Sequence, residues 1–199
     1  MSYAKHFATT VSLFYTGASA GNYSYTYQND MNQDGVNNDL IYIPKTKDEL
    51  TFVEKNGFTA QEQADAFWTF VCQDPYLSKH KGQYAEAYSA RYPWVHQFDL
   101  KIVQDFHLQV GKNKNTLQLS LDMLNIGNLL CDKWGVVKIP TNSGSLLRYE
   151  GVTADNTPTF SMYCTKVDGK NTLPTTTFDY QKNSSSCWQI QIGVRYIFN

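Results

Sequence analysis

Apolar and polar residues alternate along the last segment of the chain, from Trp188 to Phe198. Every second residue is apolar: Trp188, Ile190, Ile192, Val194, Tyr196 and Phe198. Because successive side chains of a β-strand point to opposite faces, this pattern predicts a strand with one apolar and one polar face. The segment is long enough to cross a bilayer as a tilted strand, for which about 9–11 residues suffice. Its length and its terminal aromatics favour a strand of an outer-membrane barrel over the edge strand of a soluble β-sandwich.

Two more alternating segments, 98–110 and 117–123, are separated by a short polar turn rich in asparagine and lysine. They predict a hairpin, with leucines and other apolar residues on one face and charged or amide residues on the other. Paired residues of neighbouring strands must share a face. We therefore expect Val110 opposite Leu117 or a residue of the same parity, and not opposite Thr116.

A looser alternation near the start of the chain, in which Phe14 falls on the polar face, predicts one further strand. The expected strands lie near residues 7–27, 94–110, 116–125 and 188–198. The connections 28–93 and 126–187 are long, whereas the hairpin turn is short, and outer-membrane barrels show this asymmetry. We predict an all-β fold: about four antiparallel strands of an outer-membrane barrel, with long outer loops that carry short helices.

The first long connection contains the signature of a helix N-terminus. Thr59 and Glu62 have the spacing of a capping box. Apolar residues follow at helical spacing: Ala64, Phe67, Trp68 and Val71. The pattern predicts a short amphipathic helix that ends near Asp74.

The composition changes this picture little. The chain has 17 basic and 18 acidic residues, a net charge of −1, and so lacks the basic surface expected of a nucleic-acid-binding protein. Aromatic residues make up 15% and charged residues only 18%, as suits strands that hide their apolar half by alternation. No apolar run is long enough for a transmembrane helix. Residues 1–6 lack the pattern of a secretory signal, so we expect either that the true start lies upstream or that the reading frame is truncated.

An acidic, asparagine-rich segment, 30–39, has the spacing of the first half of a calcium-binding loop. Oxygen-bearing side chains occupy its first, third and fifth positions and glycine the sixth. The expected ligands of Ca²⁺ are Asp30, Asn32, Asp34, Val36 through its carbonyl, Asn38 and Asp39. The twelfth position is Ile41 instead of glutamate. An asparagine-rich turn whose side chains satisfy backbone amides is therefore the alternative.

The residues that most often carry catalysis form no recognisable constellation. The four cysteines lie outside the predicted strands: Cys72, Cys131, Cys164 and Cys187. Their even number permits disulfides such as Cys164–Cys187, free thiols are the alternative, and the absence of a CxxC motif argues against zinc. His107 is expected to join Asp105 in a polar network on a strand face, without the third group that a catalytic triad needs. We predict that the chain is not an enzyme. The alternative within enzymes would be a hydrolase that uses cysteine or histidine.

Aromatic side chains in or beside the predicted outer loops are candidate ligand contacts. Aromatic faces stack on sugars and other planar or apolar nutrients, and the stretches 23–27 and 84–92 are rich in tyrosine. The residues singled out are Tyr25, Tyr27, Trp68 and Trp134. Ordinary packing within long loops is the alternative, because loops of this length must bury something.

Three parts of the chain resemble the TonB-dependent outer-membrane receptors, specifically the subgroup that takes up large nutrients and oligomers. The stretches that carry the likeness are Tyr23–Tyr27 with Asp30–Gly35 and Asn38–Pro44, Arg91–Trp94 with Phe98–Lys101 and Gln104–Phe106, and Leu119–Asp122 with Asn125–Leu130. Their order matches the end of such a receptor's barrel. The chain departs from the pattern at Cys131, where a polar residue is more usual, and at Asn199, which extends past the terminal Phe198.

The resemblance implies a location in the outer membrane of a Gram-negative bacterium. Members of the family enclose a plug domain in a barrel of about 22 strands, and an inner-membrane complex transmits energy to the plug. The implied partners are the remainder of the barrel and plug, outer-membrane lipid, the barrel-assembly machinery that reads the last strand, and the energy-coupling complex acting through the plug. The chain would close the barrel and supply ligand-facing loops, without transporting anything alone. The alternative is a soluble, secreted β-rich module for carbohydrate binding or adhesion, stabilised by calcium.

Overall fold

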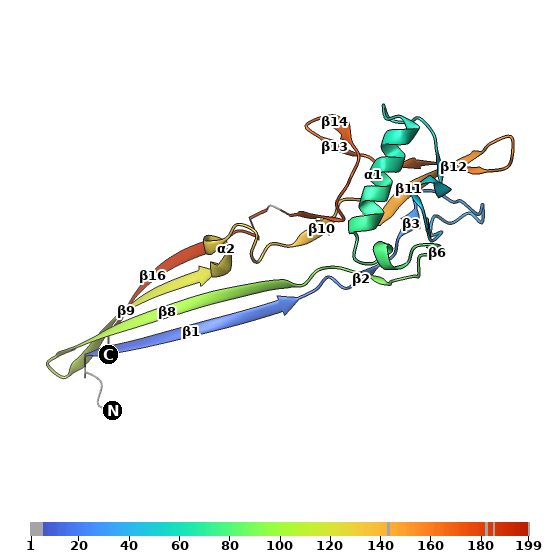
Figure 1. The fold of residues 1–199 in the computed structure, drawn as a ribbon. Coiled ribbons are helices and arrows are strands. Elements are labelled where there is room, and N and C mark those ends of the chain that lie inside the picture. The colour runs from blue at the N-terminus through green and yellow to red at the C-terminus, as the bar shows by residue number, and fades with distance from the viewer. Residues whose placement is uncertain (1–5, 143, 182, 185, 199) are drawn as a thin grey trace. The chain divides into compact units, whose positions relative to one another are not determined.

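The computed structural model describes residues 6–142, 144–181, 183–184 and 186–198 (Figure 1). Strands make up 47% of the chain and helices 13%, and most strand pairs are antiparallel, so the chain is mostly β with antiparallel sheets, as predicted in part. The chain divides into two compact units. The first unit comprises residues 1–19, 94–137 and 180–199, and the second comprises 20–93 and 138–179. No helix in the described part of the chain is long and apolar enough to span a membrane.

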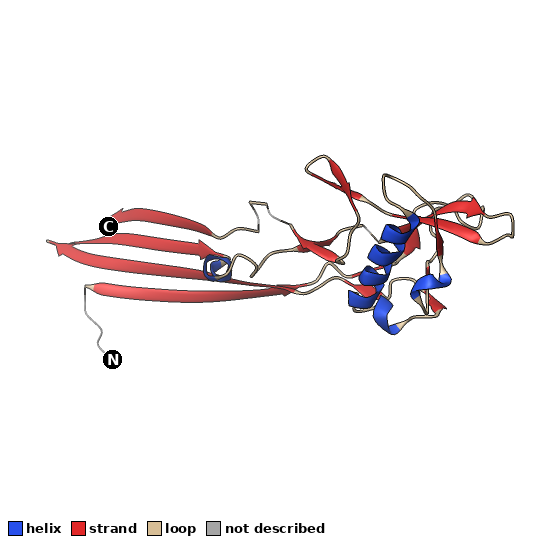
Figure 2. Cartoon of the chain, turned by 45° about the horizontal axis from the view of Figure 1, so that its top comes forward, coloured by secondary structure: helices blue, strands red, loops and turns tan. Residues whose placement is uncertain are grey.

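The first unit is a four-stranded antiparallel sheet in the order β1-β8-β9-β16 (Figures 1 and 2). Its strands are β1 (Phe7–Ala18), β8 (Val95–Val110), β9 (Asn113–Leu124) and β16 (Gln189–Phe198). Within the described ranges, β1 and β16 each pair on one side only, so the sheet is open at both edges. No closed barrel forms from these four strands.

The hairpin between β8 and β9 is tighter than the sequence predicts. Val110 pairs with Asn113, which has the same parity as Leu117, so the predicted parity is confirmed while β9 begins three residues earlier than expected. Two residues make the turn, and Gly111 adopts a φ of 64° in its first position. A two-residue hairpin with glycine first requires this left-handed conformation, which glycine adopts without a Cβ clash.

One face of this sheet is apolar along all four strands. Residues of one parity in β1 and β9 pair with residues of the other parity in β8 and β16, which brings the apolar sets together. The face carries Phe7, Val11, Leu13, Tyr15, Phe98, Leu100, Ile102, Phe106, Leu108, Leu117, Leu119, Leu121, Met123, Ile190, Ile192, Val194, Tyr196 and Phe198. No described residue of the first unit covers it fully: Leu13 is 66% exposed and Ile192 75%.

The opposite face carries polar pairs that link neighbouring strands. Three pairs join β8 to β9: Lys101 Nζ to Asp122 Oδ1 at 2.7 Å, Gln118 Nε2 to Asp105 Oδ1 at 2.9 Å, and His107 Nδ1 to Thr116 Oγ1 at 2.9 Å. The predicted polar network around His107 therefore exists, but His107 and Asp105 bond across to β9 and not to each other.

The end of the sheet opposite the hairpin turn is fixed by one buried asparagine. Asn125, 4% exposed and in the left-handed conformation, follows β9 and precedes the short helix α2 (Ile126–Leu130). Its backbone N–H donates to Asp99 Oδ1 at 2.7 Å. Its side-chain amide donates to the carbonyls of Gly135 at 3.3 Å and Ser186 at 3.0 Å. One side chain thus ties three chain segments together.

The second unit is a small α+β assembly formed by the segments predicted to be outer loops. A sheet in the order β3-β11-β12-β5 is built from β3 (Thr26–Tyr27), β5 (Thr51–Phe52), β11 (Ser145–Val152) and β12 (Pro158–Met162). The remaining strands are short: β2 (Asn22–Tyr23), β4 (Tyr42–Ile43), β6 (Gln83–Tyr84), β7 (Ala90–Arg91), β10 (Lys138–Pro140), β13 (Thr165–Val167), β14 (Lys170–Thr172) and β15 (Phe178–Tyr180). Two single 3-10 turns, η1 (Lys47–Glu49) and η2 (Leu77–Lys79), complete the unit.

The predicted strand over residues 7–27 is wrong in its second half. β1 ends at Ala18, and the tyrosine-rich stretch that follows belongs to the second unit. Tyr25 and Tyr27 are buried there, at 1% and 2% exposure. Alternation alone could not separate the two regions, because both continue the same parity.

The helix α1 (Ala60–Gln73) covers the core of the second unit and confirms the predicted amphipathic helix. The Thr59 side chain accepts from the backbone of Glu62, and the Glu62 side chain accepts from the backbone of Thr59, so the capping box forms as predicted. The buried core comprises Tyr25, Tyr27, Ile41, Ile43, Phe52, Phe67, Phe70, Val71, Leu77, Ala85, Ala90, Leu146, Leu147, Phe160 and Met162. The unit therefore has the apolar centre of an independent small domain.

Candidate functional site

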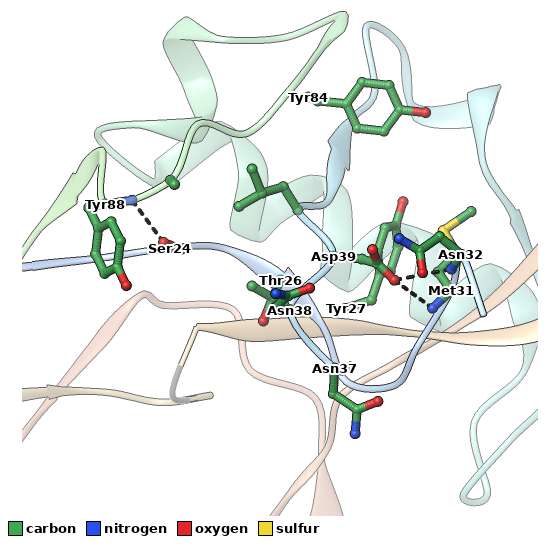
Figure 3. Close-up of a pocket in the computed structure, with 12 residues that line it drawn as sticks. Ser24, Thr26, Tyr27, Met31, Asn32, Asn37, Asn38, Asp39, Tyr84 and Tyr88 are labelled. Atoms are coloured by element: carbon green, nitrogen blue, oxygen red, sulfur yellow. Dashed lines mark hydrogen bonds between the residues drawn. The ribbon is translucent and has the colours of Figure 1, made fainter. Parts of the chain in front are cut away.

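A pocket of about 880 Å³ opens in the second unit between two segments, 24–40 and 84–88 (Figure 3). Its lining residues are Ser24, Thr26, Tyr27, Met31, Asn32, Asn37, Asn38, Asp39, Leu40, Tyr84, Ala87 and Tyr88. The volume lies in the range of small-molecule sites, about 300–1,000 Å³. Amide, carboxylate and tyrosine side chains dominate the lining, and we call this cavity the ligand pocket.

Tyr27 links the ligand pocket to the core. Its ring stacks on Phe160 at a centroid distance of 5.6 Å and an interplanar angle of 14°. Its hydroxyl accepts a hydrogen bond from the Tyr42 backbone N–H at 3.2 Å. Burial, the largest cause, raises the pKa of Tyr27 to about 12, so the phenol stays neutral at physiological pH. Tyr27 is a rigid, neutral part of the pocket wall.

The asparagine-rich loop 30–39 forms a second wall, and its carboxylates hold its own backbone. Asp30 accepts from the backbone N–H of Gly35 at 2.7 Å and of Asp34 at 3.2 Å. Asp39 accepts from the backbone N–H of Met31 at 2.7 Å and of Asn32 at 3.1 Å, as Figure 3 shows. These bonds produce the amide-satisfying turn that is the alternative to a calcium loop.

In the same turn, hydrogen bonds link the predicted calcium ligands Asp30, Asn32 and Asp34 to one another. Asn32 Nδ2 donates to Asp34 Oδ2 at 3.1 Å, and Asp34 Oδ1 accepts from the Val36 N–H at 2.8 Å. Each carboxylate oxygen can accept more than one partner, so these bonds leave acceptor capacity on Asp30 and Asp34. The residue in the glutamate position, Ile41, is fully buried at 0% exposure. Any cation here would therefore be held by the first half of the loop and by Asn38 or Asp39.

Two exposed tyrosines stand at the mouth of the ligand pocket. Tyr84 is 64% exposed and Tyr88 71%. Tyr88 has a φ of 55°, a left-handed conformation that is unusual for a bulky residue, and its N–H donates to Ser24 Oγ at 2.8 Å (Figure 3). Tyr84 packs edge-on against Tyr42, with ring centroids 5.3 Å apart. Strained backbone held by a specific hydrogen bond is typical of binding sites.

The four aromatic residues singled out from the sequence have different environments. Tyr25 and Tyr27 are core residues, and only Tyr27 lines the ligand pocket. Trp68 is half-buried on α1, with the Lys81 ammonium 4.2 Å from its ring centroid. Trp134 lies in the first unit and is 58% exposed. The tyrosine-rich stretch 84–92, and not any of these four residues, supplies the exposed rings at the pocket.

All four cysteines are free: Cys72, Cys131, Cys164 and Cys187. Two of them, Cys72 and Cys187, are exposed. Of the two alternatives left open by the sequence, a bridge such as Cys164–Cys187 or free thiols, the structure has the free thiols. Among the described residues, no group of three or more histidine, cysteine, aspartate or glutamate side chains is arranged to hold a metal ion.

The pocket of tyrosines and amides in the second unit is thus the site where the residues marked by the sequence come together. Comparison of the chain with protein-family models, with curated proteins and with solved structures finds no match.

Proposed function

We propose that this chain is the barrel-closing part of a TonB-dependent nutrient receptor in the outer membrane of a Gram-negative bacterium. The observation that carries the proposal is the continuous apolar face of the sheet β1-β8-β9-β16. Every strand has exposed large side chains on this face, with exposures that run from 38% for Leu119 to 75% for Ile192. A water-soluble domain rarely leaves so large an apolar surface open, whereas a lipid-facing barrel wall requires it.

The open edges of the sheet support the same proposal. In lipid, every backbone amide and carbonyl must be satisfied within the protein, so β1 and β16 need further strands on their free sides. The remainder of the receptor barrel would supply those strands, and its plug would meet the polar face. The chain alone is then not competent for transport, and energy coupling would act through the plug.

The ligand pocket supports a role in nutrient contact. Exposed rings at Tyr84 and Tyr88 beside amide side chains provide stacking faces and hydrogen-bonding groups, as sugars or other planar nutrients require. In this proposal the second unit is formed by extracellular loops of the receptor.

Paired substitutions on β16 test the membrane proposal. Ile192 lies on the apolar face, whereas its neighbour Gln191 lies on the polar face opposite Asp122. A lysine on a lipid-facing strand costs about 2–4 kcal/mol at the bilayer midplane. We expect Ile192→Lys to lower the protease-protected fraction of protein refolded into lipid vesicles, and Gln191→Lys to leave it unchanged. Equal effects of both variants would count against a lipid-facing sheet.

A soluble, secreted module for carbohydrate binding or adhesion is the second candidate. The apolar core of the second unit favours it, because that unit resembles an ordinary water-soluble domain. Sedimentation of the whole chain without detergent separates the two candidates. Aggregation is expected of a barrel segment, whereas a monodisperse protein with a sharp thermal transition would favour the soluble module.

We also propose that the loop 30–39 binds Ca²⁺ through the ligands predicted from the sequence. Without the bidentate glutamate we expect weak binding, with a Kd of about 10⁻⁴–10⁻³ M, as in extracellular modules. Calorimetric titration should show saturable heat that Asp34→Asn reduces. Asp155→Asn, at an exposed turn of the same unit, should leave it unchanged. Absence of heat at millimolar calcium would leave only the hydrogen-bonded turn.

A further inference from the structure

A second cavity, of about 270 Å³, lies elsewhere in the second unit and shares no lining residue with the ligand pocket. The turn that follows α1, strand β7 and Phe178 of β15 surround it. Its volume is just below the usual range of ligand sites, about 300–1,000 Å³, and so suits a molecule with a single ring and not an oligomer.

Positive charge lines this cavity without a matching surface carboxylate. Lys79 and Arg91 are exposed lining residues. Neither belongs to an ion pair among the described residues, whose salt bridges lie elsewhere. Among the described residues that line the cavity, Asp74 is the only acidic one.

The carboxylate of Asp74 is buried and forms its hydrogen bonds with other residues of the second unit. Its exposure is 1%. Oδ1 accepts from the backbone N–H groups of Tyr76 at 2.9 Å and Leu77 at 2.8 Å, and Oδ2 accepts from the hydroxyls of Tyr25 at 2.6 Å and Thr177 at 2.7 Å. Four donors use the acceptor capacity of a carboxylate almost completely. Lys79 and Arg91 are therefore left to interact with what enters the cavity.

Aromatic rings form the walls. Tyr23 and Phe178 meet edge to face, with centroids 6.1 Å apart at 86°. Tyr76 stacks on His80 at 4.2 Å and 25°. The His80 Nδ1 donates to the Tyr76 carbonyl at 2.8 Å, because a carbonyl can only accept. Flat apolar surfaces thus stand beside the two cationic side chains.

Tyr23 does not compete with an anion for those cations. The single hydroxyl proton of Tyr25 goes to Asp74, so at the 3.0 Å contact between the two tyrosines Tyr23 must donate to Tyr25. Burial, the largest cause, raises the pKa of Tyr23 above its ordinary value, so the phenol stays neutral at physiological pH.

We infer that this cavity binds a small aromatic carboxylate, with the ring between the aromatic walls and the carboxylate on Lys79 and Arg91. Arginine forms a planar, paired interaction with carboxylates, and lysine adds a point charge. The inference goes beyond the proposed receptor role, because it concerns a site that neither the barrel wall nor the ligand pocket uses.

Fluorine NMR titration of the whole chain, refolded in detergent micelles, tests the site with two probes that share the fluorinated ring and have similar size. Fluorobenzoate carries the carboxylate, and fluorobenzyl alcohol is the neutral counterpart. We expect saturable binding of fluorobenzoate, weakened about tenfold or more in the double variant Lys79→Gln/Arg91→Gln, since hydrogen bonds to charged groups are the strong ones. The matched control is Lys166→Gln/Lys170→Gln, which removes two exposed charges on the β13–β14 hairpin of the same unit.

Three results would overturn the site: no saturable binding of fluorobenzoate, unchanged affinity in the double variant, or equal affinity for the alcohol. Because Lys79 and Arg91 are exposed, the double variant is expected to fold, which circular dichroism checks. Failure here would leave the membrane proposal standing, because that proposal depends on the insertion of the first unit.

Discussion

At the scale of single residues, Asn125 connects separate segments of the first unit. It holds the exit of β9 through Asp99 and two carbonyls, while its Oδ1 is buried without a hydrogen-bond partner. Gly135 lies directly beside that oxygen, and a Cβ built on Gly135 would lie 2.0 Å from Asn125 Oδ1. The glycine is thus required by close approach as well as by its φ of 64°.

A pair of alanine substitutions separates these two requirements. Gly111 has the same φ of 64° in the same unit, but nothing lies within 4 Å of its built Cβ. We expect Gly111→Ala to lower stability by about 1–2 kcal/mol, the cost of a left-handed L-residue. Gly135→Ala should cost about 1–3 kcal/mol more, because Asn125 must move. Chemical denaturation of the micelle-refolded protein measures both; equal losses would mean that the contact with Asn125 is unimportant.

At the scale of elements, the sequence predicted best the strands and the helix that depend on a local residue pattern. The alternation in β8, β9 and β16 and the capping box of α1 each depend on local residues, and these elements were predicted to within a few positions. The short strands of the second unit were missed because each has only two or three residues outside β11 and β12, too few to show a period. Such strands are fixed by pairing between distant segments, as when Thr26 of β3 lies beside Ser145.

The N-terminal cap of α1 offers a matched test of local prediction. Thr59→Ala removes the side chain that accepts from Glu62 N, and should cost about 1 kcal/mol. Thr46 stands in the same position before η1 without a side-chain cap bond, so Thr46→Ala should change stability by less than about 0.5 kcal/mol. Urea unfolding followed by circular dichroism compares them, and similar losses would contradict the role of the cap.

The capping box also predicts a pH dependence. Hydrogen bonds from the Thr59 backbone and side chain lower the pKa of Glu62. A carboxyl group whose pKa is lower in the folded state stabilises the fold above its unfolded pKa, and this contribution disappears as pH falls through the folded pKa. The stability difference between the wild type and Glu62→Gln should therefore shrink in acid. A difference that stays constant from neutral to acidic pH would contradict this.

At the scale of the whole molecule, the two units differ in how they meet solvent. The first has an open apolar face, and Val136 is the only buried apolar side chain among its described residues, whereas the core of the second comprises fifteen buried residues. The sequence indicated the first unit through periodicity. It could not indicate that the predicted outer loops share one core, because Leu146 and Phe70 come from opposite halves of the chain and meet only through tertiary contacts.

The ligand pocket, like the fold, could be predicted from the sequence only in part. The loop 30–39 and the tyrosine-rich stretch 84–92 were both marked by composition, and both contribute to the ligand pocket. Their adjacency was not predictable, since it depends on the pairing of β4 with β6. The cavity around Arg91 was not predicted, although Tyr23 and Arg91 lie in the tyrosine-rich stretches 23–27 and 84–92, because its charges and rings come from four separate segments.

We expect the two units to unfold separately. Detergent concentration should shift the transition of the first unit, whose apolar face needs cover, and should leave that of the second unit in place. Differential scanning calorimetry at two detergent concentrations measures this. A single transition that moves as a whole would indicate that the two units unfold cooperatively.

The even number of strands in the sheet has a topological consequence. β1 begins at Phe7, paired with Phe106, and β16 ends at Phe198, paired with Asn115, so both ends of the sheet-forming chain lie beside the hairpin turn at Gly111. The start of β1 and the end of β16 therefore lie at the same end of the strands, the end that has the hairpin turn. If that sheet is a membrane wall, an epitope fused to either terminus reports the same compartment, and a label on Lys112 reports it as well.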